Sequence, residues 1–285
     1  MEIPEIRHIA GNPSLQGMAE AKQNIVYSTA TGTEIKLTLL TPWGAAERGD
    51  RLPLIAFIQG SAWTNPDLNY QILQMGWYAQ RGYAVAMLTH RNCLDGHPFP
   101  AYLTDVKTAI RFLRAHASEY AIDGSRVCAW GTSSGGNTAL LMGLTGDDPA
   151  YRTGEYADQS DAVQLVVECF GPTDLVKMLD GFRPGELPLD DIFYALTAGR
   201  DMRQVLREMS PVYHLELGKA YPPFLLIHGD RDDVVPYEQM ELMYRALLKI
   251  GAYARAIRVD GAPHEGSFWS RELHGIILDY IREKL

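Results

Sequence analysis

The sequence predicts a single α/β domain in which helices cover a mostly parallel β-sheet. Short runs of β-forming residues alternate along the chain with longer amphipathic runs, and this alternation is typical of such a sheet. The chain has 285 residues, 46% of them hydrophobic, which is enough for one large core. We therefore expect residues 1–285 to form one domain with local insertions.

The runs that predict strands differ in how deeply they are buried. Residues 33–42 alternate polar and apolar side chains, as a half-exposed strand near the edge of a sheet does. Residues 52–60 and 83–90 are continuously apolar, which suits strands that are buried on both faces. Further strands are predicted within residues 122–130, 163–170, 224–230 and 254–260.

Helices are expected between most of these strands. Residues 70–81 predict the first helix, which Gly82 closes. Within residues 101–120, apolar side chains recur at helical spacing and predict a second helix. The remaining helices are expected at residues 134–144, 237–250 and 268–285.

One long segment breaks this regular alternation. Residues 171–221 carry several prolines and scattered aromatic residues, among them Phe182, Phe193 and Tyr194. Because the strand and helix patterns return only after this segment, we expect it to be an insertion that caps the domain.

Charge and cysteine content argue against several kinds of partner. The formal net charge of −9 opposes binding to nucleic acid or to an anionic membrane, both of which need a basic face. No run is long enough to span a bilayer, and the first residues lack the basic start and apolar stretch of a secretory signal. Three distant cysteines, Cys93, Cys128 and Cys169, predict no disulfide framework. We expect a cytoplasmic protein, although a secreted one without its leader would look the same, and the oligomeric state stays open.

The motif that carries chemistry is GTSSG, residues 131–135, a G-x-S-x-G between a predicted strand and a predicted helix. This is the context of a nucleophile elbow, a strained turn that lifts a serine above the carboxyl edge of the sheet. Ser133 is central between the two glycines and is the predicted nucleophile. Ser134, one position later, is expected to contribute its backbone N–H group to an oxyanion hole. The alternative is a glycine-rich turn without chemistry.

A second oxyanion donor is expected in the loop that follows the strand at residues 52–60. There the chain reads QGSAW, and we predict that the backbone N–H groups of Ser61 and Ala62 join that of Ser134 around the substrate oxygen. Trp63 is predicted to line the substrate site together with aromatic residues of the cap. An ordinary turn at the end of a strand is the alternative for this loop.

A serine nucleophile needs a histidine base that is itself oriented by a carboxylate. In folds with a nucleophile elbow on a mostly parallel sheet, these residues follow one another along the chain in the order serine, acid, histidine. His264 is the predicted base, because it lies in a loop of small residues between the last strand and the last helix. The other downstream histidines are less suitably placed. His274 lies inside the last helix, His228 ends a strand, and His214 belongs to the segment that leaves the cap.

The acid is expected in the loop HGDRDDVVP, at the carboxyl end of a strand. Asp232 is the predicted partner of His264, whereas Asp230 and Asp233 are expected to be turn and cap residues. Glu168, at the end of the preceding strand, is the outside candidate. Three close carboxylates can also bind a metal ion, but no histidine or cysteine set stands nearby at ligand spacing. We therefore expect neither a metal nor another cofactor.

Three stretches of the chain have the residues of a known family: 99–143 around the elbow, ECFGPTDL at 168–175 and PPFLLIHGDRDDVVPY at 222–237. They resemble the α/β-hydrolases of the hormone-sensitive-lipase and carbohydrate-esterase type, particularly bacterial acetyl xylan and feruloyl esterases. The resemblance covers most of the chain from Leu52 onward, except the cap. It implies the α/β-hydrolase fold with Ser133, Asp232 and His264 as the triad.

Two positions depart from the pattern of that family. Relatives usually have His-Gly-Gly-Gly where this chain has Gln59, Gly60, Ser61 and Ala62, so the choice of oxyanion amides is open. Ser134 stands where relatives commonly have alanine and where dipeptidyl-peptidase-type members have tyrosine. The lack of that tyrosine weakens the interpretation as a peptidase.

Taken with the resemblance, these residues predict a serine carboxylesterase that works through an acyl-enzyme intermediate. The resemblance alone implies the substrate class, acetyl or feruloyl esters of plant polysaccharides. An exopeptidase or amidase of the prolyl-oligopeptidase type, using the same triad, is the alternative enzyme. A catalytically silent binder with a hydrolase fold is the alternative from a different class.

Overall fold

The computed structural model describes residues 7–183, 185–186 and 189–285. Over these residues it contains one eight-stranded sheet with the order β1-β2-β4-β3-β5-β6-β7-β8. The strands are β1 (Ala19–Ser28), β2 (Ile35–Pro42), β3 (Leu52–Ile58), β4 (Ala84–Leu88), β5 (Ile122–Thr132), β6 (Leu165–Cys169), β7 (Phe224–Gly229) and β8 (Ala254–Val259). β2 pairs antiparallel with β1 and β4, and every other pair in the sheet is parallel. The predicted fold class, a mostly parallel α/β sheet, is confirmed.

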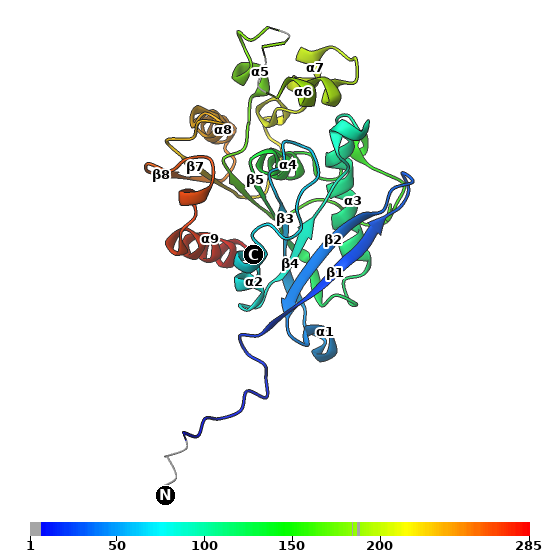
Figure 1. Ribbon diagram of the computed structural model, residues 1–285, viewed down its shortest axis with the longest axis vertical. Coiled ribbons are helices and arrows are strands. Elements are labelled where there is room, and N and C mark those ends of the chain that lie inside the picture. The colour runs from blue at the N-terminus through cyan, green and yellow to red at the C-terminus, as the bar shows by residue number, and fades with distance from the viewer. Residues whose placement is uncertain (1–6, 184, 187–188) are drawn as a thin grey trace, which may run out of the picture.

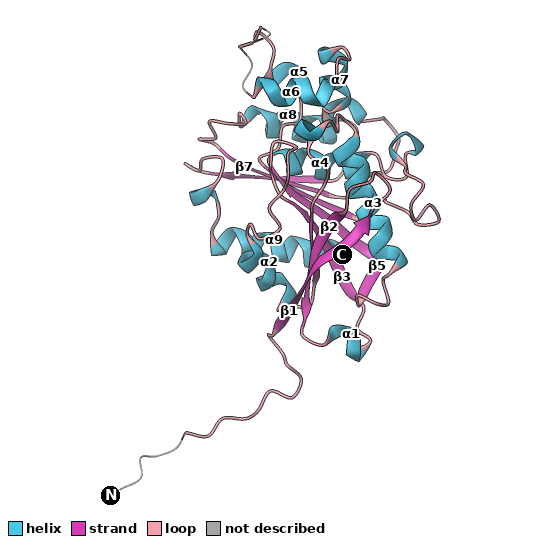
Figure 2. Cartoon of the chain, turned by 45° about the vertical axis from the view of Figure 1, so that its right-hand side comes forward, coloured by secondary structure: helices cyan, strands magenta, loops and turns pink. Residues whose placement is uncertain are grey.

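Helices cover both faces of this sheet, as Figures 1 and 2 show. The helices are α1 (Ala45–Arg48), α2 (Ile72–Ala79), α3 (Ala101–Ala115), α4 (Ser134–Leu144), α5 (Leu175–Met178), α6 (Asp190–Thr197), α7 (Met202–Glu208), α8 (Glu238–Lys249) and α9 (Arg271–Lys284). Short 3-10 turns are η1 (Cys93–Asp95), η2 (Pro149–Tyr151), η3 (Pro211–His214) and η4 (Gly266–Phe268). The buried side chains of α3, α4 and α8 belong to one hydrophobic cluster and those of α2 and α9 to the other. None of the helices in the described ranges has the length and apolarity needed to cross a membrane.

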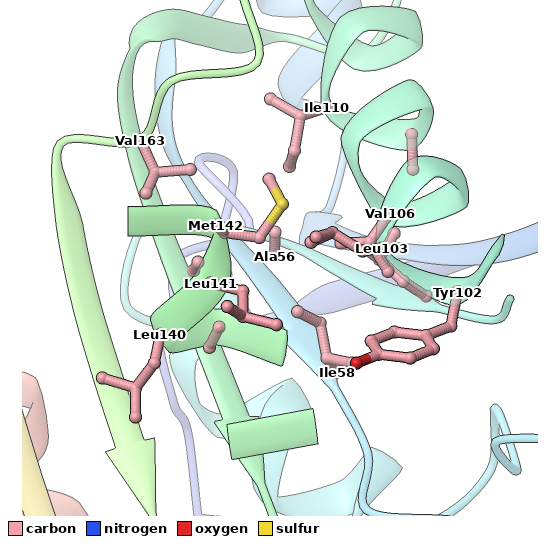
Figure 3. Packing of buried hydrophobic residues seen from close by; sticks show 14 of the residues in the cluster. Ala56, Ile58, Tyr102, Leu103, Val106, Ile110, Leu140, Leu141, Met142 and Val163 are labelled. Carbon is pink, nitrogen blue, oxygen red and sulfur yellow. The ribbon is translucent and has the colours of Figure 1, made fainter. Parts of the chain in front are cut away.

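The central strands are apolar throughout because successive side chains point to opposite faces and both faces are covered. In β3, Leu54, Ala56 and Ile58 belong to the cluster under α3 and α4, whereas Ile55 and Phe57 belong to the cluster under α2 and α9. Figure 3 shows Ala56 and Ile58 packed among side chains of α3 and α4. This double burial fixes β3 and β5, the two strands that lead to the predicted site.

The edge of the sheet differs from the expectation. The strand predicted at residues 33–42 is β2, but it is not half-exposed: six of its eight residues are buried. β1 takes the edge position and pairs with β2. Its sequence AEAKQNIVYS is polar over most of its length and therefore gave no strand signal, yet it shields β2 from solvent.

The carboxyl ends of the parallel strands meet at one edge, and the described residues of the segment 171–221 lie over that edge (Figure 1). Its described residues form α5, α6, α7 and η3 and contain no strand. The expectation of a cap falls on this segment, within which residues 184, 187 and 188 lie outside the described part of the chain. The packing of α6 against η1 brings this segment to the loop that follows β4.

Candidate active site

The strand β5 and the helix α4 hold Ser133 in a sharp turn between them. Ser133 has φ 51° and ψ −124°, a backbone conformation that residues other than glycine rarely adopt. Its N–H group donates to the carbonyl oxygen of Cys169 at 2.9 Å, which anchors the turn to β6. A Cβ atom at Gly131 would overlap the carbonyl oxygen of Gly135, and one at Gly135 would overlap that of Ile58. The two glycines of the motif are therefore required by the backbone on either side of the serine.

Two further loops bring a histidine and an aspartate to this serine. His264, in the loop after β8, places Nε2 2.9 Å from Ser133 Oγ. Its Nδ1 lies 2.7 Å from Oδ2 of Asp232, in the loop after β7. With the proton on Nδ1 donated to Asp232, Nε2 is free to accept the proton of the Ser133 hydroxyl. The structure thus brings together the three side chains that the sequence singled out.

Asp232 is held as an anion by the groups around it. Its side chain is fully buried, and that of His264 is 15% exposed. Oδ1 accepts the backbone N–H groups of Val234 at 2.9 Å and Val235 at 2.8 Å. Burial is the largest influence and opposes ionisation, but hydrogen bonds from His228, His264 and Val235 outweigh it and lower the pKa of Asp232 well below its usual value. The carboxylate therefore stays charged and fixes the orientation of the imidazole.

The other candidates from the sequence take supporting places. His228 is buried, donates from Nε2 to the carbonyl oxygen of Val235 at 2.9 Å and lies 3.1 Å from Asp232 Oδ2, so it braces the acid loop. Asp230 accepts the N–H group of Gly261 at 2.6 Å. His274 packs in the core, where its Nδ1 lies 3.0 Å from the hydroxyl of Tyr78.

Glu168, the outside candidate for the acid, does not bond to His264. Its Oε1 accepts the backbone N–H group of Gly171, in the turn that follows β6. Burial, reinforced by the charge of Asp232, raises the pKa of Glu168 to about 8 despite that hydrogen bond. Glu168 is therefore a protonated, turn-holding group at neutral pH and cannot orient a cationic imidazole as Asp232 does.

An aromatic side chain that the sequence did not single out stands behind the base. Phe170 directly follows β6, has φ 43° and is fully buried. Its ring meets the His264 imidazole edge-on at 4.7 Å between centroids and also packs against the ring of Phe268 at 4.6 Å. The only sequence signal was its position as the last residue of the strand predicted at residues 163–170. Phe170 limits how far the imidazole can swing away from Ser133.

The loop after β3 approaches the first turn of α4, as expected for an oxyanion loop. Ala62 and Trp63 both have left-handed backbone conformations, with φ 50° and 59°. Gln59 braces the loop, because its Oε1 accepts the N–H group of Asp67 at 2.5 Å. The N–H groups of Ala62 and Ser134 make no hydrogen bond to other described residues, so both remain available to an oxyanion.

Ser61 differs from the prediction. Its backbone N–H group donates to the side-chain oxygen of Ser134 at 2.9 Å instead of standing free. The sequence shows that Ser134 carries a hydroxyl where relatives have alanine, but it does not show that this hydroxyl lies within reach of the Ser61 amide. Of the three amides predicted at Ser61, Ala62 and Ser134, those of Ala62 and Ser134 are the two without a hydrogen bond to other described residues.

A cavity of about 360 Å³ opens beside Ser133 and is largely apolar. Trp63, predicted to contact substrate, is one of its walls and packs against Tyr102 and Phe193. The rest of the lining comes from the loop after β3, the elbow, the segment 171–221 and the acid loop: Ala62, Ser133, Ser134, Pro172, Leu175, Met178, Leu179, Leu189, Phe193, Asp233, Val234 and Val235. No group of three or more histidine, cysteine, aspartate or glutamate side chains with metal-binding geometry occurs among residues 7–183, 185–186 and 189–285.

Comparison with known proteins finds esterases among the relatives of this chain. "Esterase LipC" from Mycobacterium tuberculosis is 30% identical over 220 residues, which is 74% of this chain and 52% of LipC. "Probable carboxylic ester hydrolase LipM" from the same organism is 30% identical over 188 residues, 66% of this chain and 43% of LipM. The chain thus spans about half the length of these curated relatives.

Solved structures match over nearly the whole chain. A truncated carbohydrate esterase from gut microbiota superimposes with a TM-score of 0.78 at 27% identity, covering 93% of this chain and 96% of that one. Thermogutta terrifontis esterase 2 with bound butyrate superimposes with a TM-score of 0.74 at 24% identity, covering 95% of both chains, a likeness that concerns the fold alone. These matches establish the α/β-hydrolase fold that the resemblance implied.

The fold and the arrangement of serine, histidine and aspartate are those of an α/β-hydrolase. The family BD-FAE matches residues 43–247, well over half of the chain. The protein therefore belongs to the BD-FAE family of α/β-hydrolases.

Proposed function

We propose that this protein hydrolyses carboxylic esters through an acyl-enzyme on Ser133. The observation that carries the proposal is the position of the His264 imidazole, 2.9 Å from Ser133 Oγ and 2.7 Å from Asp232 Oδ2. A serine hydroxyl becomes a competent nucleophile only when a base within hydrogen-bond reach removes its proton.

In the first half of the reaction, Ser133 Oγ forms a bond to the ester carbonyl carbon while its proton moves to His264 Nε2. The carbonyl oxygen becomes an oxyanion, which the N–H groups of Ala62 and Ser134 stabilise. When the tetrahedral intermediate collapses, the bond to the alcohol oxygen breaks and His264 returns the proton to that oxygen. Water then attacks the acyl-Ser133 ester, again with His264 as base, and releases the acid and the free serine.

For the acyl group, we propose a hydroxycinnamoyl ester such as feruloyl in preference to acetyl, with a plant polysaccharide as the alcohol. The cavity beside Ser133 supports the larger acyl group, since its walls are apolar and aromatic and its volume is about 360 Å³. Trp63 and Phe193 are aromatic members of this lining and can pack against a planar acyl group. The match to a truncated carbohydrate esterase over 96% of that chain supports the polysaccharide.

A panel of substrates tests this proposal against its alternatives. The wild-type protein and Ser133→Ala are assayed on p-nitrophenyl acetate and butyrate, methyl ferulate, acetylated xylan and aminoacyl anilides. We expect the wild type to hydrolyse the esters, with a higher kcat/KM for methyl ferulate than for acetylated xylan, and Ser133→Ala to lose nearly all turnover. Faster cleavage of the anilides would instead identify an amidase. Absence of turnover on every substrate, with no labelling of Ser133 by an organophosphonate, would identify a silent binder.

A further inference from the structure

The hydroxyl group of Ser134 sits at the junction of the elbow and the oxyanion loop. Its oxygen accepts the backbone N–H group of Ser61 at 2.9 Å and that of Trp63 at 3.2 Å. Ser134 is 3% exposed, and it lines the same cavity as Ser133 and Ala62. The side chain next to the nucleophile therefore contacts the loop that carries the other oxyanion donor.

Because the Ser134 hydroxyl already accepts two backbone N–H groups, it can make one further hydrogen bond, as a donor. A hydroxyl oxygen has two acceptor positions and one proton, and both acceptor positions are used here. The proton makes no hydrogen bond to any other described residue, although the side chain is buried. Both amides belong to the loop after β3, and Ser134 also lines the cavity beside Ser133, so its unpaired O–H group can turn to a substrate carbonyl there.

We propose that the Ser134 hydroxyl is a third oxyanion donor, which adds its O–H group to the N–H groups of Ala62 and Ser134. This inference rests on the proposed ester hydrolysis at Ser133. The two N–H groups that the oxygen accepts polarise its O–H bond, because hydrogen bonds in a chain strengthen one another. The N–H group of Ser61 does not donate to the oxyanion itself. It strengthens the hydrogen bond that the Ser134 hydroxyl donates to the oxyanion.

A purely structural role for the same hydroxyl is the competing explanation. Ala62 and Trp63 both have φ near the left-handed helical region, 50° and 59°, and a non-glycine residue in that region is strained. The two hydrogen bonds to Ser134 hold the loop in this conformation, so their loss could also displace the Ala62 amide. Ala62→Gly separates the two roles, since glycine adopts this conformation without strain and keeps the amide.

The experiment compares Ser134→Ala and Ser134→Thr in the wild-type and Ala62→Gly backgrounds. It measures kcat and KM on p-nitrophenyl butyrate and the inhibition constant of an aryl trifluoromethyl ketone. The ketone carbon bonds to Ser133 Oγ, its oxygen becomes an oxyanion, and the serine proton moves to His264, so binding reports the hole without turnover.

We expect Ser134→Ala to lower kcat about 10-fold to 100-fold with KM changed less than about two-fold, since a single oxyanion donor is worth at least that much. The inhibition constant of the ketone should rise by a similar factor. Threonine, which keeps the hydroxyl, should retain most of the activity, and Ala62→Gly should not rescue Ser134→Ala.

An alanine variant with kcat within about two-fold of the wild type would overturn the proposal, as would rescue by Ala62→Gly, which would leave only the structural role. A wild type that hydrolyses no ester but binds the ketone would refute the proposed function, while the ketone still measures the contribution of Ser134.

Discussion

Replacing Asp232 by asparagine tests the central arrangement of the site, and the structure shows why the amide cannot substitute. Each carboxylate oxygen faces two donors: Oδ1 faces the N–H groups of Val234 and Val235, and Oδ2 faces His264 Nδ1 and His228 Nε2. An asparagine must turn its NH₂ group toward one of these pairs. Either choice brings a donor against donors.

Of the two orientations, the one that keeps the backbone bonds places the NH₂ group against His264. The imidazole can then accept at Nδ1 only if its proton moves to Nε2, which faces Ser133 at 2.9 Å and can no longer remove the serine proton. The opposite orientation leaves the two amides of the acid loop without an acceptor, at about 1 to 3 kcal/mol each. We therefore expect the wrong tautomer to dominate.

The expected loss in kcat is about 10⁴-fold, which is the effect of the same change in a serine protease triad and corresponds to about 5 kcal/mol of transition-state stabilisation. The assay is initial-rate hydrolysis of p-nitrophenyl butyrate near neutral pH, with a thermal melt to show that the variant is folded. Asp230→Asn is the matched control, because Asp230 lies in the same loop but bonds to Gly261 and not to His264. A folded Asp232→Asn variant with more than about a tenth of wild-type kcat would refute this account of the site.

Two further perturbations address the elbow and the buried acid beside it. Gly131→Ala should reduce kcat by at least about 10-fold and lower the melting temperature, because its Cβ atom meets backbone and not a movable side chain; an active, equally stable variant would contradict the elbow geometry. The pKa of Glu168 is about 8 in the folded protein, compared with an ordinary value of 4.5. The protonated carboxyl therefore contributes its full stabilisation below about pH 4.5, and this contribution is lost as the pH rises toward about 8. Urea unfolding should show a free energy of unfolding that falls with pH by up to about 1.4 kcal/mol per unit across this range, and less steeply in Glu168→Gln. Equal slopes in the two proteins would show that Glu168 does not carry the proton.

Much of the fold could be predicted because its signals are local. The continuously apolar runs predicted β3 and β4, and the elbow sequence predicted α4 at Ser134–Leu144, where the structure has it. β1 was missed because its residues are mostly polar and its pairing partner, β2, supplies the stability. Propensity and periodicity describe a segment by itself and do not register what a neighbouring segment contributes.

The same division holds within the candidate site. The sequence by itself determined the three side chains of the triad, since the elbow requires glycines at fixed positions and the fold orders the serine, acid and base along the chain. Tertiary structure alone decided that Phe170 backs the His264 ring and that Ser61 gives its amide to Ser134, a residue 73 positions away. These contacts join segments that are distant in the chain, and their distances depend on how whole strands and loops pack. No local pattern of residues encodes such a distance.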